Sequence, residues 1–255
     1  MTADKPDTSL EDIRREIDAI DDGLLQLLVR RFDASARVRA TKKTDGSIAS
    51  SPLRPAREAM MLRRLLAARG ESVPADALVR LWRVILSAST QAQAPLAIHV
   101  DARISGDPGL SVRVAEHFSG MTWQLHPDTR SSLVELMKKS GDLAVVKLDS
   151  PWASWLSSQQ AQAIGVVATL PVIAERKMPD LLVFGHADPQ PSGQDETILI
   201  SPDPLPASKM QLRWQGQSGD WHVSGYGGFL ANSDIQGLGG NVFLAGRCPT
   251  SIEVF

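Results

Sequence analysis

The stretch LEDIRREIDAIDDGLLQL, residues 10–27, decides the first part of the fold. Its large apolar residues recur at intervals of three and four: Leu10, Ile13, Ile17, Ile20, Leu24 and Leu27. This spacing places side chains on one face of an α-helix. Ser9 followed by Asp12 is an N-terminal capping signal, and the pattern continues to about Lys42. Such a helix is about 50 Å long, which no compact three-helix monomer covers, so we expect a second subunit.

Two more helices are expected before the residue pattern changes from helical periodicity to short β-branched runs near residue 94. Pro55 suits the first position of a helix that ends at Gly70. A third helix begins near Pro74. Its apolar side holds Leu78, Leu81, Trp82, Ile85 and Leu86. Beyond it, short β-branched runs alternate with Gly, Pro, Asp and Ser clusters. We therefore predict a multidomain chain, with a three-helix domain at residues 1–94 and a small α/β domain at residues 95–255.

Polar residues interrupt the apolar faces of all three helices. The spacing of the first helix leads on to Arg31 and Lys42. Glu58 shares the apolar face of the second helix, and the face of the third leads to Ser89 and Gln93. Any one of them alone fits a side chain whose stem packs while its head reaches water. Five on three helices indicate a shared pocket, and because a buried charge is costly unless paired, the inward cations indicate a small, multiply charged acid as ligand.

These residues also carry a resemblance to a known family. Residues 13–31 resemble the opening helix of the all-helical chorismate mutases. Arg14, Asp21 and Arg31 match the spacing of the family's opening pattern, and Lys42 falls where the family places its lysine. Each match is weak alone, but their combination is specific.

The resemblance continues through the other two helices. Residues 55–58 resemble the arginine-glutamate opening of the family's second helix, and Ser89 with Gln93 resembles the end of its third. In all, it covers about residues 9–94. It implies an intertwined helical homodimer that rearranges chorismate to prephenate in aromatic amino-acid biosynthesis, without a cofactor or a metal. Catalysis then comes from holding a reactive conformer and stabilising charge in the transition state.

The resemblance implies a role in the reaction for seven residues: Arg14, Arg31, Lys42, Arg57, Glu58, Ser89 and Gln93. Arg14 of the partner subunit and Arg31 would grip the carboxylates of the substrate, with Ser89 assisting. Arg57 would help to fix the carboxylate end. Arginine suits this task because its planar fork binds a carboxylate through two parallel hydrogen bonds.

The remaining roles concern the ether oxygen and the ring hydroxyl of the substrate. Lys42 and Gln93 would donate hydrogen bonds to the ether oxygen, which gains negative charge as its bond to carbon breaks. Glu58 would accept a hydrogen bond from the ring hydroxyl. The sequence departs from the family at Arg54, where an acidic residue is common. Because a cation opposes the dipole at a helix N-terminus, we expect weaker substrate binding more than lost chemistry.

The second half of the chain is expected to form an α/β layer. Strands are expected at 96–100, 143–148, 164–169, 181–185, 197–201 and 241–245, with helices at 111–118 and 132–139. Residues 106–115 and 143–148 resemble parts of prephenate dehydratase, although its threonine-arginine-phenylalanine motif is absent. We therefore predict a reduced, non-catalytic relative of that enzyme, which senses an aromatic amino acid or packs on the mutase dimer.

Composition limits the classes of function. The 255 residues carry a formal net charge of -2, which gives no sign of a nucleic-acid partner. The five histidines lack metal-ligand spacing, and the single cysteine, Cys248, excludes an intrachain disulfide. The sequence contains no secretory signal and no apolar run long enough to span a membrane. We expect a cytoplasmic protein that acts on a small molecule.

Two other functions stay open at this point. The chain could be a non-catalytic regulatory dimer that binds chorismate-like or aromatic amino-acid ligands. It could also be a structural dimerisation module in which the inward charges fix the register of the helices. Turnover of chorismate separates the enzyme from both alternatives, and ligand binding without turnover separates the second from the third.

Overall fold

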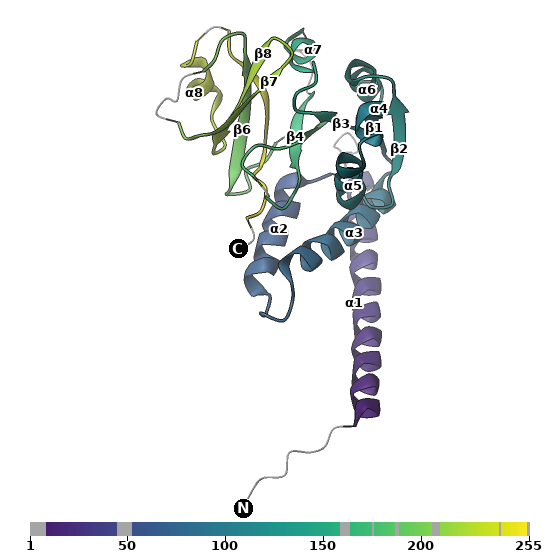
Figure 1. Cartoon of the computed structure of the whole chain (residues 1–255). Coiled ribbons are helices and arrows are strands. Elements are labelled where there is room, and N and C mark those ends of the chain that lie inside the picture. The colour runs from purple at the N-terminus through teal and green to yellow at the C-terminus, as the bar shows by residue number, and fades with distance from the viewer. Residues whose placement is uncertain are drawn as a thin grey trace, which may run out of the picture. The chain divides into compact units, whose positions relative to one another are not determined.

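A computed structural model describes residues 9–44, 53–158, 164–174, 176–186, 189–205, 210–239 and 241–253 (Figure 1). The chain divides into two compact units, Met1–Ile48 and Ala49–Phe255, called here the N-terminal and the C-terminal unit. The boundary predicted at residue 94 lies inside the C-terminal unit and stays a prediction.

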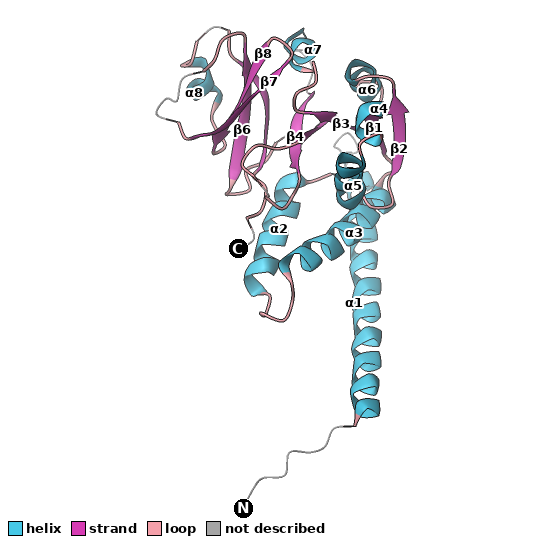
Figure 2. Ribbon diagram, in the orientation of Figure 1, coloured by secondary structure: helices cyan, strands magenta, loops and turns pink. Residues whose placement is uncertain are grey.

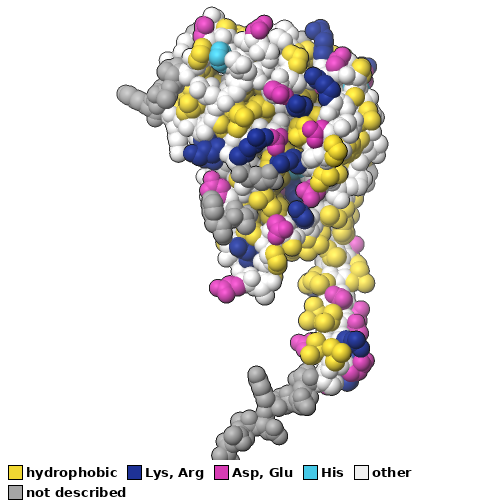
Figure 3. Space-filling model, in the orientation of Figure 1, with side chains coloured by type: hydrophobic (Ala, Val, Ile, Leu, Met, Phe, Trp, Pro, Cys, Tyr) yellow, Lys and Arg dark blue, Asp and Glu magenta, His cyan; other side chains and the backbone are white. Residues whose placement is uncertain are grey.

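The N-terminal unit holds one helix, α1 (Leu10–Thr44), among its described residues (Figure 1). Ser9 and Asp12 form the predicted capping pair: the Asp12 backbone N–H donates to Ser9 Oγ at 3.1 Å, and the Ser9 N–H donates to Asp12 Oδ2 at 3.2 Å. The long helix predicted from the sequence is confirmed. Figure 3 shows apolar side chains on the surface of α1. The exposed ones are Leu10, Ile13, Ile17, Ile20, Leu24, Leu25, Leu27, Val29 and Val38.

Two helices begin the C-terminal unit, α2 (Pro55–Ala68) and α3 (Ala75–Gln93). Both match the predicted second and third helices. Pro55 occupies the start of α2 as expected, and Arg54 at its N-cap makes no side-chain capping bond. The two helices share one apolar cluster, which includes Leu62, Leu66, Leu78, Val79 and Ile252.

A mixed sheet fills the rest of this unit, with helices beside it (Figure 2). The described strands are β1 (Ala97–Asp101), β2 (Thr122–His126), β3 (Leu143–Lys147), β4 (Ile164–Leu170), β5 (Leu181–His186), β6 (Asp195–Ser201), β7 (Leu212–Ser218), β8 (Trp221–Gly227) and β9 (Phe243–Pro249). They are ordered β2-β1-β3-β5-β4-β9-β6-β8-β7. The described short helices are α4 (Ala102–Ser105), α5 (Pro108–His117), α6 (Thr129–Leu136), α7 (Ala153–Ser158) and α8 (Asn232–Gln236). The predicted combination of a helical region and an α/β region is confirmed.

The direction of the strands changes across the sheet. β1 pairs in parallel with both β2 and β3, whereas β5 is antiparallel to β3 and β4. β9 then runs parallel to β4 and antiparallel to β6, and β6, β8 and β7 follow in antiparallel order. The pairing of β4 with β9 is short, with one paired position, Val166 opposite Gly246, among the described residues.

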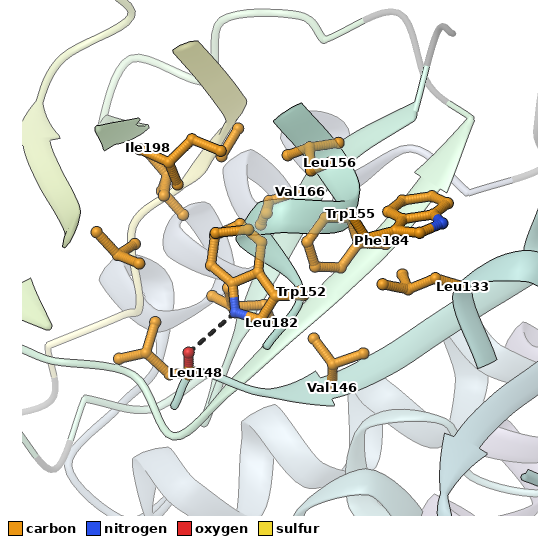
Figure 4. Close-up of a cluster of buried hydrophobic side chains, with 14 of the residues drawn as sticks. Leu133, Val146, Leu148, Trp152, Trp155, Leu156, Val166, Leu182, Phe184 and Ile198 are labelled. Atoms are coloured by element: carbon orange, nitrogen blue, oxygen red, sulfur yellow. Dashed lines mark hydrogen bonds between the residues drawn. The ribbon is translucent and has the colours of Figure 1, made fainter. Parts of the chain in front are cut away.

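The central strands are buried on both faces. Ala144, Val146 and Phe184 point into a cluster with α6 and α7, which Figure 4 shows around Trp152. Val183, one position from Phe184, points into the opposite cluster with α4 and α5. Two-sided burial explains why β3, β5 and much of β4 read as continuous apolar runs, and why the sequence predicted them.

Several elements were not predicted. β2, β7 and β8 lie in or next to the two edges of the sheet. The side chains of β2 are mostly exposed, and Leu125 is 59% exposed. β7 and β8 are rich in Gly, Gln and Ser, so neither an apolar run nor a regular alternation marks them. The short helices α4, α7 and α8 span four to six residues, too few to show a period.

We predict that Gly246→Ala destabilises the protein strongly. A Cβ at this position would collide with the backbone nitrogen and oxygen of Val166 on β4, so the strands must separate. The expected loss in the free energy of unfolding is about 3 kcal/mol, measured by urea denaturation. Gly141→Ala is the control, because its Cβ would meet nothing within 4 Å. Equal stability of the two variants would contradict the close approach of β4 and β9.

Candidate active site

Three of the seven predicted residues lie on α1. The Arg14 side chain is exposed and pairs with Glu11 on the same helix at 3.6 Å. Such a surface pair contributes little to stability, so the guanidinium stays available for a ligand. Arg31 is half-buried, and its carbonyl oxygen accepts a hydrogen bond from Ser35 Oγ at 3.1 Å. Lys42 lies in α1, but its side chain is outside the described part of the structure.

The other four predicted residues lie on α2 and α3 of the C-terminal unit. Arg57 is exposed near the start of α2, and Glu58 beside it is buried. Ser89 is buried on α3 and donates its hydroxyl hydrogen to the Ile85 carbonyl at 2.8 Å. Gln93 is the last residue of α3 and is half-buried. Ser89 and Gln93 are four residues apart, so they share one face of the helix.

Glu58 is joined to a residue that the sequence analysis did not single out. Arg83 on α3 donates from Nη1 to Glu58 Oε2 at 2.6 Å. The side chains are only 6% and 11% exposed for Arg83 and Glu58, so this is a buried, charge-assisted hydrogen bond. Oε2 accepts this bond, which leaves Oε1 for another donor.

Arg83 is itself fixed by the α/β region. Its Nε and Nη2 donate to the carbonyl oxygen of His117, the last residue of α5, at 3.2 and 2.9 Å. Ser87, one turn further along α3, donates to the same oxygen at 3.2 Å. The signal for Arg83 was present in the sequence, since it lies four residues from both Val79 and Ser87 on a second buried face of α3. The predicted site residues of α3 came from the other face, which leads to Ser89 and Gln93.

A small cavity opens beside Glu58, with a volume of about 50 Å³. Its lining residues are Leu53, Pro55, Glu58, Ala59, Leu62, Arg83, His117, Ala168, Thr169, Val172, Pro249, Thr250, Ser251 and Ile252. Most of this lining is apolar. Its walls thus come from α2 and α3 as well as from the α/β region.

Burial shifts the pKa values of two titratable groups at or near this cavity. Burial, followed by the nearby charge of Arg83, holds the pKa of His117 well below its ordinary value, so its imidazole is neutral at physiological pH. Its Nδ1 has no hydrogen-bond partner among the described residues. Thr169, which lines the cavity, donates a hydrogen bond to Glu196 at 3.5 Å. Burial raises the pKa of Glu196, while a hydrogen bond from Trp214 Nε1 at 2.9 Å lowers it.

A second contact ties α2 to the α/β region. The Arg63 guanidinium donates to Ser192 Oγ at 3.0 Å, to the Gln194 carbonyl at 2.9 Å and to the Thr250 carbonyl at 3.1 Å. Together with Arg83, it attaches both helices to segments far away in the sequence. Arg63 therefore holds α2 against the α/β region, and Arg83 holds Glu58 itself.

The comparisons with known proteins agree with the first part of the sequence analysis. Residues 13–94 match the family model of chorismate mutase type II. This part of the chain is thus a chorismate mutase domain, the domain of an isomerase, and the resemblance predicted for it is confirmed. No curated protein matches the chain.

Two solved structures match part of the chain. One is prephenate dehydratase from Streptococcus mutans, at 12% identity and a TM-score of 0.40, covering 60% of this chain and 96% of that one. The other is GqqA, described as a novel type of quorum quenching acylase, at 11% identity and a TM-score of 0.41, covering 61% and 95%.

Two further findings concern metals and membranes. Within the described ranges, no group of three or more His, Cys, Asp and Glu side chains is placed to hold a metal ion. None of the helices that the structure describes combines the length and the apolar character that crossing a bilayer requires.

We predict that removing one partner of the buried ion pair costs far more than removing both charges. Arg83→Met leaves a buried, unpaired carboxylate and is expected to cost about 3–5 kcal/mol of unfolding free energy. Glu58→Gln combined with Arg83→Met should cost less than Arg83→Met alone, because no buried charge remains. The measurement is urea denaturation of the three proteins.

The control is Arg80→Met on the same helix. Arg80 pairs with Glu116 at 3.4 Å, with side chains 62% and 45% exposed, so its loss is expected to cost under about 1 kcal/mol. A similar cost for Arg80→Met and Arg83→Met would refute the special position of Arg83.

Proposed function

We propose that the chain acts as a homodimeric chorismate mutase whose active site combines residues of both subunits. The observation that carries this proposal is the match of residues 13–94 to the chorismate mutase type II family. The matched range includes all seven predicted residues, which lie on α1, α2 and α3. The reaction is the rearrangement of chorismate to prephenate, as expected for aromatic amino-acid biosynthesis. The cytoplasmic location stays a prediction from the sequence.

The properties of α1 support the dimer. Its exposed apolar side chains recur at helical spacing over the length of the helix, and burying such a face is the main gain in association. Arg14 and Arg31 are 17 positions apart, which is about 26 Å along the helix axis. Since a small dicarboxylate does not span that distance, the two arginines can serve one substrate only if they come from different copies.

The proposed chemistry is electrostatic. Arg14 of the partner subunit and Arg31 bind the carboxylates of chorismate and hold its reactive conformer. Ser89 assists them and Arg57 fixes the carboxylate end. As the ether bond breaks, negative charge on its oxygen is stabilised by hydrogen bonds from Lys42 and Gln93. This scheme needs no covalent intermediate.

Glu58 completes the proposed site by accepting a hydrogen bond from the ring hydroxyl of the substrate. Its Oε2 is engaged by Arg83, so Oε1 is the acceptor in this scheme. Arg54 stands where the family often has an acidic residue, and its side chain does not cap α2. Recognition of the hydroxyl therefore depends on Glu58, and we expect a weakened affinity for chorismate.

For residues 95–255 we propose a supporting and regulatory role. A reduced dehydratase-like domain could bind an aromatic amino acid as an effector. It could also serve only to pack on the mutase dimer. The alternative for the whole chain is a regulatory dimer that binds chorismate-like ligands without turnover. Arg54 at the N-cap of α2, where an acidic residue is common in the family, favours this alternative. A chorismate assay tests for turnover, and the same assay with added phenylalanine, tyrosine or tryptophan tests for regulation.

We predict that Arg31→Ala and Lys42→Ala each lower kcat/KM for chorismate by at least about 100-fold, the effect of removing one preorganised donor in a charged transition state. Chorismate consumption is followed by absorbance, and the dimer is checked by light scattering. Arg37→Ala, an exposed change on the same helix, serves as control and should keep normal turnover. Normal activity of Arg31→Ala or Lys42→Ala would contradict the assigned site.

The shared active site predicts complementation between inactive variants. When Arg14→Ala and Arg31→Ala subunits are co-expressed, half of the dimers are mixed and each mixed dimer has one intact site, so about a quarter of the wild-type activity should return. Arg31→Ala with Lys42→Ala is the matched control, because both residues act in the site of their own subunit and nothing should return. Absence of complementation in the first pair would exclude the intertwined arrangement.

A further inference from the structure

We infer that Arg83 is a positioning residue for the rearrangement of chorismate, which holds the carboxylate of Glu58 through a bond that the α/β region itself fixes. This inference rests on the proposed function, in which Glu58 accepts a hydrogen bond from the substrate. Arg83 does not touch the substrate in this scheme; it acts through Glu58.

The geometry of the guanidinium supports this role. All three of its nitrogens are engaged: Nη1 with Glu58, and Nε with Nη2 on the single carbonyl oxygen of His117. A planar fork held at both ends has one orientation. Because the Nη1 bond goes to Oε2 of Glu58 at 2.6 Å, it restricts the rotation of the carboxylate and so orients Oε1.

Arg83 is the one permanently charged cation among the described residues that line the cavity beside Glu58. Among the residues that line the cavity, Arg83 and His117 are the other titratable side chains. His117 is neutral for the reasons given above, so Arg83 supplies the positive charge that a buried carboxylate needs. The remaining polar side chains of the lining, such as Thr169 and Thr250, are uncharged.

The inference gives residues 95–255 an indirect part in the reaction, through the positioning of Glu58. His117 lies outside the chorismate mutase match, which ends at residue 94, and the oxygen that it provides is the last carbonyl of α5. The same oxygen also accepts from Ser87. α5 therefore sets the position of α3 and, through Arg83, the position of a predicted active-site carboxylate on α2.

A double-mutant cycle on kcat/KM for chorismate tests this chain of contacts. Glu58→Gln, Arg83→Met and the double variant are compared with the wild type, with activity expressed per folded protein by circular dichroism. We expect Arg83→Met to lower kcat/KM at least about tenfold, and to have little further effect when Glu58→Gln is already present. A purely structural role would instead add its loss to that of Glu58→Gln.

Two more variants make the result specific. Ser87→Ala removes a donor to the same His117 oxygen without touching Glu58, so it should leave kcat/KM within about twofold of the wild type. Arg83→Lys keeps the charge but not the fork, and should restore part of the activity lost in Arg83→Met. If Arg83→Met does not fold, Arg83→Lys takes its place in the cycle, with a smaller loss that again disappears in the Glu58→Gln background.

The outcomes separate the two proposals. Wild-type activity for Arg83→Met, additive losses in the cycle, or an equal loss in Ser87→Ala would each overturn the positioning role while leaving the mutase intact. If the wild-type protein itself does not convert chorismate, the proposed function fails instead. Partial recovery in Arg83→Lys together with a non-additive cycle supports the inference.

Discussion

The buried ion pair between Glu58 and Arg83 connects the two kinds of structure in this chain. A carboxylate removed from water is stable only when a positive charge accompanies it, and that charge is anchored on the oxygen of His117 in the α/β region. The second and third helices of the chorismate mutase domain are therefore part of the same compact unit as the sheet. Arg63 on α2 strengthens this attachment through hydrogen bonds to oxygens of Ser192, Gln194 and Thr250.

The first helix follows a different constraint. α1 has 35 residues and exposes most of its apolar face within a single copy of the chain. Its long regular pattern made it easy to recognise, since periodicity over many turns is the strongest signal in a sequence. An apolar face of this extent also explains why a second copy enters the proposal, because burying such a face is the main gain in association.

The sequence predicted the parts of the fold in which local pattern and burial agree. β3 and β5 are apolar throughout because both faces are covered, whereas the exposed edge strand β2 carries no such pattern. In the candidate site, the seven residues followed from one face of each helix and from the family resemblance. The spacing of Val79, Arg83 and Ser87 marks Arg83 as part of a second buried face of α3, but its partner His117 lies 34 positions away in the sequence, and no local pattern encodes that contact. Helix α5 begins at Pro108, three residues before the predicted start, since Asp107 caps it.

The position of β9 has a consequence for how the protein is made. This strand lies between β4 and β6 but follows both of them in the chain. During synthesis, β4 and β6 each present an unpaired edge until β9 has left the ribosome, and open edges recruit other chains. The nascent protein is therefore most prone to aggregation late in translation, and a chaperone that covers one of these edges would protect it during that interval.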